Sequence, residues 1–271
     1  MQGRGRSTSL QYYPSRRDVL SVSGTGDSLQ KVLLQKPADK NEHSAASQNR
    51  STIRVKAGGN EKGIVVHKAF ISEFSGYFEG ALSGSFSETE NGVVIIDDVD
   101  EKAFNVFADF IYTQQIPEGL KDWAVYAEID LGTGNAELEE KNLDIALLLW
   151  YRTYILADRL IVPTLKEALL EDFFKEFQDG TSYPHGPGVP ELCENLLDTD
   201  PLIKLLVDAQ CLRPDPDNTR WMESFQHLPQ NFLARVTLRL YDLWETDKKK
   251  SRKPRALDRS NYGLDEPSRK L

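Results

Sequence analysis

The 271-residue sequence has no long hydrophobic run and very few cysteines. Because no stretch of about eighteen apolar residues is present, we expect no membrane-spanning helix. The N-terminal residues also lack the apolar segment of a secretory signal. Cys193 and Cys211 are the only cysteines, which argues against a disulfide framework and fits a reducing compartment. We therefore expect two free, buried thiols, with a single disulfide as the less favoured alternative.

Recognisable catalytic motifs are absent as well. The sequence contains no nucleophile elbow, phosphate-binding glycine loop or zinc-protease pattern, and its four histidines are scattered. Asp97, Asp98 and Asp100 lie close together, but a strand end and a helix cap explain them better than a metal site does. We therefore predict no enzymatic activity, metal, cofactor or small-molecule substrate. The alternative, an enzyme with an unrecognised site, requires a deep polar pocket with converging titratable groups.

Positive charge is scarce in the middle of the chain. Residues 1–50 and 246–271 carry net charges of +4 and +5, which leaves −18 for residues 51–245. Phosphate contacts require clustered lysine and arginine, so the acidic body is a poor nucleic-acid surface and should favour protein partners. Because both basic ends show little periodicity, we expect disordered tails over 1–50 and 246–271.

The most strongly patterned stretch begins at Val65 and ends at Thr113. An apolar run at 93–96 follows the turn dipeptide Asn91-Gly92 and predicts a strand that is covered on both faces. Asp100 can then cap a helix whose apolar residues recur with helical spacing. The residues of that helical face are Phe104, Phe107, Ala108 and Ile111.

A hairpin and two short helices are predicted upstream of that strand. Residues 52–56 alternate between apolar and charged, 58–63 have turn composition, and 64–66 supply the returning strand. Residues 69–82 contain two short helical segments with apolar faces. His67 lies where the second strand meets the first helix. We expect it to close that corner by hydrogen bonding rather than to bind a metal, because no cysteine or second histidine is near it.

Together these residues resemble the core of a BTB/POZ domain. Four pieces occur in the family's order, namely V-H-K-A, S-x-Y-F, F-S-E and F-x-x-F-x-x-F-I-Y-T, and the H-K-A and I-Y-T forms resemble fungal members. The resemblance implies an α+β fold in which a small three-stranded mixed sheet is surrounded by a cluster of short helices. It also implies a non-enzymatic role in protein–protein interaction.

The predicted domain extends over residues 51–178. Residues 114–142 contain prolines, glycines and a run of glutamates, which indicates an insertion with one short helix around Trp123. Residues 143–158 and a segment that begins at Pro163 resemble the family's paired C-terminal helices, and proline suits the first turn of the second one. The buried stripe expected on that second helix is formed by Val162, Leu165, Leu169, Phe173 and Phe177.

Prolines and glycines over 179–190 indicate a linker. Residues 191–245 then predict helices that pack on the domain, because they hold too few apolar residues for an independent core. They resemble C-terminal extensions of many fungal BTB proteins. Asp200 is expected to cap a helix that begins at Pro201 and ends near Val207. The apolar face of a last helix is formed by Phe232, Val236, Leu240 and Leu243.

The first candidate site is Phe86-x-Glu88. It matches the hydrophobic-x-Glu element with which BTB adaptors of cullin-based ubiquitin ligases contact the cullin, so the resemblance implies partner binding by Phe86 and Glu88. The alternative is that Phe86 tucks under its loop and Glu88 is merely solvated. The chain departs from the family in having Ser51-Thr52 where many members have aspartate, and in lacking a kelch or MATH module. An adaptor would therefore recruit its client through the C-terminal helices or tails.

The second candidate site is a basic cluster near the C-terminus. Its residues are Lys248, Lys249, Lys250, Arg252, Lys253 and Arg255. Such a cluster suits the acidic groove of a nuclear-import receptor, and the alternative is a solubilising tail. We therefore expect a location in the nucleus, the cytoplasm or both. The predicted function is a BTB interaction module that forms a homodimer or binds a partner such as a cullin; the competing prediction is a nuclear scaffold that regulates transcription.

Overall fold

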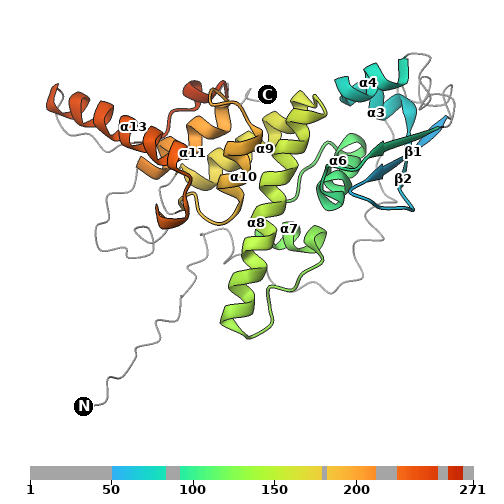
Figure 1. Cartoon of the computed structure of the whole chain (residues 1–271), viewed down its shortest axis with the longest axis horizontal. Helices are drawn as coiled ribbons and strands as arrows, with labels where there is room; N and C mark the ends of the chain where they lie inside the picture. The colour runs from blue at the N-terminus through green and yellow to red at the C-terminus, as the bar shows by residue number, and fades with distance from the viewer. Residues whose placement is uncertain (1–50, 84–91, 179–181, 212–224, 250–255, 265–271) are drawn as a thin grey trace, which may run out of the picture.

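The computed structural model describes residues 51–83, 92–178, 182–211, 225–249 and 256–264. The tail predicted over 1–50 lies outside these residues. A small sheet lies at one end of the molecule and the C-terminal helices lie at the other, with the long helix α8 (Ala136–Arg159) between them (Figure 1). In the described part of the chain, no helix is both long and apolar enough to cross a membrane.

The sheet contains three strands in the order β2-β1-β3. β1 (Thr52–Ala57) pairs antiparallel with β2 (Ile64–His67) and parallel with β3 (Val93–Ile96). The predicted small mixed sheet within an α+β fold is therefore confirmed.

Only one face of the sheet is buried, and the prediction that β3 is covered on both faces is wrong. Val94 and Ile96 are buried, whereas Ile95 between them is 58 % exposed. Successive side chains of a strand point to opposite faces, so the open face carries Ile95 beside Lys56, its register partner on β1. An unbroken apolar run therefore occurs here in a strand whose second face meets solvent.

Three helices pack around the buried face of the sheet. They are α3 (Lys68–Phe74), α4 (Gly76–Ser83) and α6 (Glu101–Thr113). The ring centroid of Phe78 on α4 lies 6.4 Å from the ring centroids of both Phe104 and Phe107 on α6. All three rings are fully buried. Aromatic rings of this size account for much of the apolar area that a core buries, so their contact holds α4 against α6.

The middle of the molecule is built by α7 (Gly119–Ala127), α8 and α9 (Pro163–Phe177). The short helix expected around Trp123 is α7, and α9 begins at Pro163 as predicted. α8 begins well before the predicted residue 143. The reason is a cap at Asn135, whose side-chain oxygen accepts hydrogen bonds from two backbone N–H groups of the first turn.

Stacked aromatic rings join these three helices. The ring centroids of Trp123 and Trp150 lie 6.0 Å apart, and those of Trp150 and Phe173 lie 4.0 Å apart. Tyr151 stacks on the same Phe173 at 5.2 Å. The buried stripe predicted for α9 is confirmed, since Phe173 and the rest of that stripe are buried.

Among the C-terminal helices, α10 (Gly188–Asn195) packs against α8 and α11 (Pro201–Cys211) packs against α9. Asp200 caps α11 by accepting the N–H of Leu202 at 2.8 Å. The predicted linker over 179–190 ends too late, because α10 begins at Gly188 and buries Val189 in the core. The two cysteines form no disulfide with each other; Cys211 is buried, whereas Cys193 is only half-buried.

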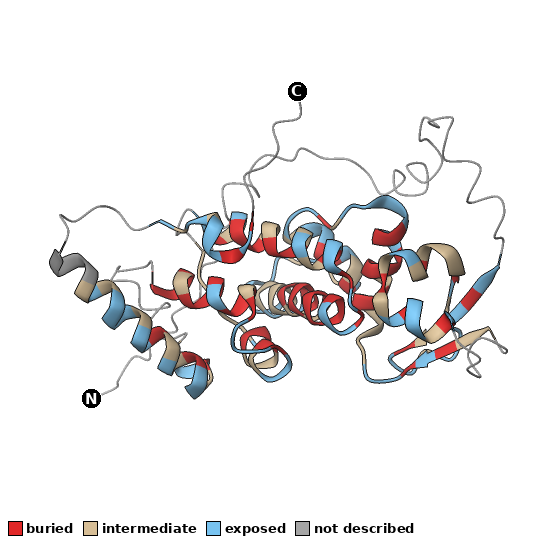
Figure 2. Cartoon of the chain, turned by 90° about the horizontal axis from the view of Figure 1, so that it is seen from above, coloured by how far each residue is buried: buried red, intermediate tan, exposed pale blue. Residues whose placement is uncertain are grey.

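The last long helix, α13 (Gln230–Lys249), follows a short 3-10 turn at Phe225–His227. Phe232 and Val236 are buried, but Leu240 of the predicted apolar face is 39 % exposed. Figure 2 shows the cause, because the outer half of α13 extends beyond the body of the molecule.

The C-terminal tail is not disordered throughout, in contrast to the prediction for 246–271. α13 continues to Lys249, and residues 256–264 are placed again, with a 3-10 helix η2 at Arg259–Tyr262. Tyr262 and Leu264 are buried. The sequence did not predict this contact. Of residues 256–264 only Tyr262 and Leu264 are buried, and two apolar residues in a short basic segment form no periodic pattern.

Candidate functional site: protein-interaction surfaces

Phe86 and Glu88 lie outside the described residues. The elements on either side of them are placed, since α4 ends at Ser83 and β3 begins at Val93. The two predicted partner-binding residues therefore belong to the connection from the end of α4 to an edge strand of the sheet. Whether Phe86 is exposed or tucked under this connection stays a prediction.

The other end of α4 is fastened to the turn between α8 and α9. The hydroxyl of Ser75 donates to the carbonyl of Leu160 at 2.6 Å, and the backbone N–H of Gly76 donates to the carbonyl of Ile161 at 3.0 Å. The N–H of Tyr77 donates to Leu160 as well, at 3.2 Å. Donors at the start of α4 that would otherwise lack an intrahelical partner are thus satisfied by the turn.

Ile161 in this turn combines backbone strain with exposure. Its φ angle is +53°, a left-handed conformation that a β-branched residue rarely adopts, and its side chain is 58 % exposed. Tyr77, at the same corner, is 40 % exposed. Strained residues with exposed side chains are frequent at functional sites. We call Tyr77 and Ile161 the corner patch.

His67 fulfils its predicted structural role at the strand-to-helix corner. It is the N-cap residue of α3, and its backbone N–H donates to the hydroxyl of Tyr112 at 2.9 Å. Its ring nitrogen Nδ1 lies 3.0 Å from the same hydroxyl. The contact ties α3 to the end of α6.

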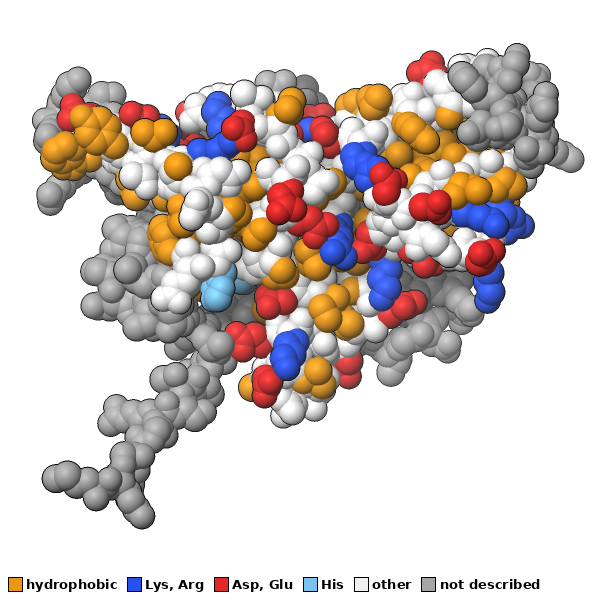
Figure 3. Space-filling view, in the orientation of Figure 1, with side chains coloured by type: hydrophobic (Ala, Val, Ile, Leu, Met, Phe, Trp, Pro, Cys, Tyr) orange, Lys and Arg blue, Asp and Glu red, His pale blue; other side chains and the backbone are white. Residues whose placement is uncertain are grey.

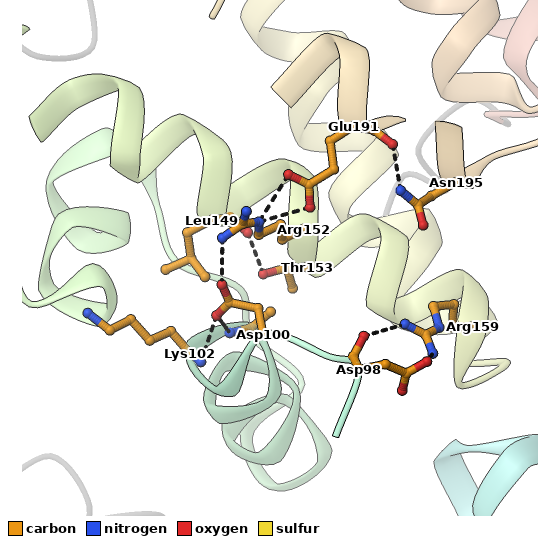
Figure 4. Close-up of polar contacts among 10 residues, drawn as sticks. Asp98, Asp100, Lys102, Leu149, Arg152, Thr153, Arg159, Glu191 and Asn195 are labelled. Atoms are coloured by element: carbon orange, nitrogen blue, oxygen red, sulfur yellow. Dashed lines mark hydrogen bonds and ion pairs between the residues drawn. The ribbon is translucent and has the colours of Figure 1, made fainter. Parts of the chain in front are cut away.

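A charged cleft lies where α6, α8 and α10 meet (Figure 4). Asp100 caps α6 by accepting the N–H groups of Lys102 and Ala103, which confirms its predicted role. Its other carboxylate oxygen accepts from Arg152 at 2.9 Å, and Arg152 also donates to both oxygens of Glu191, at 2.9 and 3.1 Å. These bonds, led by those to Glu191, raise the pKa of Arg152.

A second arginine lines the same cleft. Arg159 donates to the backbone carbonyl and the carboxylate of Asp98. The cleft encloses about 330 Å³. Each of its three carboxylates already accepts from a guanidinium, and no group of three metal-ligating side chains is found among the described residues. The arrangement is therefore suited to clamping three helices together, and Asp98 and Asp100 take the strand-end and cap roles predicted for them.

The open face of the sheet and the outer half of α13 are two further exposed apolar surfaces. Val65 and Ile95 are exposed on the sheet, and Tyr241 and Trp244 are exposed on α13. Figure 3 shows hydrophobic side chains gathered over α13. Exposed apolar surface of this kind is typical of protein–protein contacts.

The basic cluster is only partly placed. Lys248 and Lys249 are the last residues of α13, and the other four members lie outside the described residues. Residues 256–264, which follow the cluster in the sequence, belong to the described part of the chain.

The sequence did not predict two site residues, Arg152 and Ile161. Arg152 lies in a helix whose pattern identifies only its apolar face, and its partner Glu191 lies in the predicted extension. Ile161 precedes a helix-starting proline by two residues, so a turn was foreseeable there. Its left-handed backbone was not, because glycine or asparagine normally marks that conformation.

The comparison with known families agrees with this arrangement. Residues 43–129 match the family model of the BTB/POZ domain. The matched range contains the three-stranded sheet and the helices α3, α4, α6 and α7, whereas α8 and the C-terminal helices follow it. The mixed three-stranded sheet surrounded by short helices, together with this match, shows that the chain contains a BTB/POZ domain.

Proposed function

We propose that this protein is a substrate adaptor that binds a cullin through Phe86, Glu88 and the corner patch. The BTB/POZ domain makes it a protein–protein interaction module. The observation that supports the cullin contact is the position of α4, which begins at the corner patch and ends at Ser83, three residues before Phe86 in the sequence. α4 has eight residues and is about 12 Å long, so one partner helix can reach both ends.

A pulldown with a purified cullin tests the proposal. We expect the double variant Phe86→Ala with Glu88→Ala to lose binding while its circular dichroism and melting stay unchanged. Loss of a hot-spot residue at an interface costs about 2 kcal/mol or more, a more than tenfold weaker complex. Undiminished binding by this variant contradicts the proposal.

The corner patch has its own test. Ile161→Gly removes the exposed side chain in a backbone conformation that glycine tolerates, so binding should weaken without damage to the fold. Leu197→Gly is unsuitable as a control because it adds flexibility. Leu197→Ala, at a 79 % exposed position in the C-terminal half, should bind the cullin normally. Equal binding by Ile161→Gly and the wild type removes the corner patch from the proposed contact.

The nuclear scaffold is the second candidate, and the clustered cations at the end of α13 favour it. Two reporters separate its parts. A fusion of residues 246–271 tests whether the cluster directs import, and the full-length chain with Lys248, Lys249 and Lys250 changed to alanine tests whether import uses it in the folded protein. A cytoplasmic fusion and an unaltered full-length variant would each count against nuclear targeting by this cluster.

Self-association through the BTB/POZ domain is compatible with both candidates. Light scattering on residues 51–264 measures it, and the range must include 256–264 because Tyr262 and Leu264 are buried.

A further inference from the structure

The C-terminal residues 256–264, here called the tail segment, dock on the surface formed by α9 and α11. Side chains of Glu171 and Phe174 on α9, and of Lys204 and Asp208 on α11, contact it. We call these four residues the tail surface. The tail segment is joined to α13 only through residues 250–255.

Arginine recognition dominates one end of the contact. Arg259 donates two hydrogen bonds to the carboxylate of Glu171, at 2.7 and 2.5 Å. Its guanidinium carbon also lies 5.2 Å from the centre of the Phe174 ring. A two-pronged ion pair combined with a cation–π contact is specific for arginine, because lysine offers a point charge without the planar fork.

Tyrosine recognition dominates the other end. Tyr262 is buried, and its hydroxyl donates to the carboxylate of Asp208 at 2.7 Å. The centroid of its ring lies 6.0 Å from that of Phe174, so this phenylalanine contacts both Arg259 and Tyr262. Lys204 adds a hydrogen bond to the backbone carbonyl of Asn261 at 3.1 Å.

The tail segment has a local structure suited to such a contact. Asp258 caps η2 by accepting the N–H of Ser260, and Gly263 ends it with a φ of +73°. These features hold Arg259 and Tyr262 on the docked side of a single 3-10 turn. Of its nine residues only Tyr262 and Leu264 are buried, so side-chain chemistry contributes more to the contact than apolar area does.

We infer that the tail surface is a peptide-binding site that recognises an arginine three residues before a tyrosine, and that the protein's own tail segment occupies it as an internal competitor. The partner is a protein that presents the same chemistry, Arg-x-x-Tyr with an apolar residue two positions after the tyrosine. Because a short connection keeps the internal copy at an effective concentration of about millimolar, partner binding requires its displacement. This inference does not depend on the cullin contact, which involves the other end of the molecule.

The test uses the folded, full-length chain with a specific protease site inserted between Arg252 and Lys253. After cleavage, binding of a fluorescein-labelled peptide with the sequence of residues 256–264 is followed by anisotropy. We expect saturable binding to the cut protein, at least about tenfold tighter than to the uncut protein, because the internal copy is then free to leave. A peptide of scrambled sequence serves as the matched control.

A double-mutant cycle identifies the arginine contact. Replacing arginine by alanine in the peptide, and Glu171→Gln in the protein, should each weaken binding about tenfold, and the two changes together should cost little more than either alone. Fully additive losses would show that the peptide's arginine and Glu171 do not interact, and this result would overturn the inference.

Three other outcomes of the cleavage experiment would also overturn the inference. A cut protein that loses its fold, or a C-terminal fragment that excess peptide cannot displace, would make the tail segment a permanent part of the core and overturn the inference. Failure of the labelled peptide to bind a folded protein that has lost the fragment would do the same.

Discussion

At the scale of single residues, the molecule places unusual side chains where elements meet. Ile161 has a left-handed backbone in the turn between α8 and α9, and its carbonyl accepts from the start of α4. An L-residue with a β-branched side chain loses about 1–2 kcal/mol in this conformation. The hydrogen bonds from α4 hold the turn in place despite that cost, and the exposed side chain is left available for a partner.

Ile161→Gly should therefore not destabilise the protein. Relief of the backbone strain outweighs the added flexibility of glycine, so we expect the free energy of unfolding in urea to rise by about 0.5–1 kcal/mol. Ile161→Ala is the control, because it removes the side chain and keeps the strained φ. A glycine variant less stable than the alanine variant would contradict the strain argument.

Buried tyrosines predict a loss of stability in alkali. Burial, the largest cause, raises the pKa of Tyr151, Tyr154 and Tyr262 above the ordinary value of 10.0, and carboxylates beside them add to the shift. The folded state thus favours the neutral phenol. Stability should be independent of these groups below about pH 10, and should fall as the pH rises further, because the unfolded chain ionises first.

Urea unfolding at a series of alkaline pH values, together with tyrosinate absorbance, measures this effect. Tyr154→Phe and Tyr262→Phe should each flatten the decline. A stability that stays constant well above pH 10 would contradict the assignment of these phenols as neutral in the folded protein.

At the scale of elements, close backbone approach decides how the C-terminal helices dock. A Cβ atom added to Gly188 on α10 would lie 2.1 Å from a ring carbon of Tyr151 on α8. The absence of a side chain at Gly188 therefore lets α10 pack directly on that ring. Arg152, one residue further along α8, then holds Glu191 of α10 in the charged cleft.

Gly188→Ala should destabilise the protein by about 1–3 kcal/mol, because the ring or the helix has to move. The matched control is Gly80→Ala in α4, where an added Cβ meets nothing within 4 Å. That change should stabilise the protein by about 0.5–1 kcal/mol through helix propensity. Thermal melts of the two variants that shift in the same direction would contradict the close-approach argument.

Substitutions at Asp100 separate its two roles, the cap of α6 and the ion pair with Arg152. Asp100→Ser keeps a capping oxygen and loses the charge, whereas Asp100→Ala loses both. We expect the alanine variant to be less stable than the serine variant by about 1 kcal/mol in urea unfolding. Equal stability would show that the ion pair alone determines the effect.

Sequence patterns predicted the elements well where periodicity and caps coincide, as at Asp100 and Pro163. They failed where contacts between distant parts of the chain, or a cap that was not recognised, determine the structure. The one-sided burial of β3 depends on which face the helices cover, and the early start of α8 depends on Asn135. Docking of 256–264 depends on Glu171 and Asp208, whose position beside Arg259 and Tyr262 no local pattern encodes.

At the scale of the whole molecule, α8 packs against both the half that contains the sheet and the half that contains the C-terminal helices. It packs against α6 and α7 on the side of the sheet, and against α9 and α10 on the side of the C-terminal helices. The buried residues belong to one continuous cluster that runs from Ile53 to Leu264. The two halves should therefore unfold together in a single transition.

Removal of residues 179–271 tests this view. The fragment 51–178 loses α10 from the ring of Tyr151, and Tyr154 loses Asp200, which accepts from its hydroxyl at 2.9 Å. We expect it to melt at least about 10 °C below the fragment 51–264, which corresponds to several kcal/mol. Similar melting temperatures would mean that the C-terminal helices contribute little to the common core.

The position of α8 also bears on synthesis. The family match ends at residue 129, yet the indole ring of Trp123 stacks on that of Trp150, which lies in α8 beyond the match. A nascent chain that has emerged only as far as the match would leave aromatic surface in water, where chaperones or aggregation would compete for it. The BTB/POZ domain of this protein should thus acquire its stable form late in translation, once the ribosome has released α8 and α9.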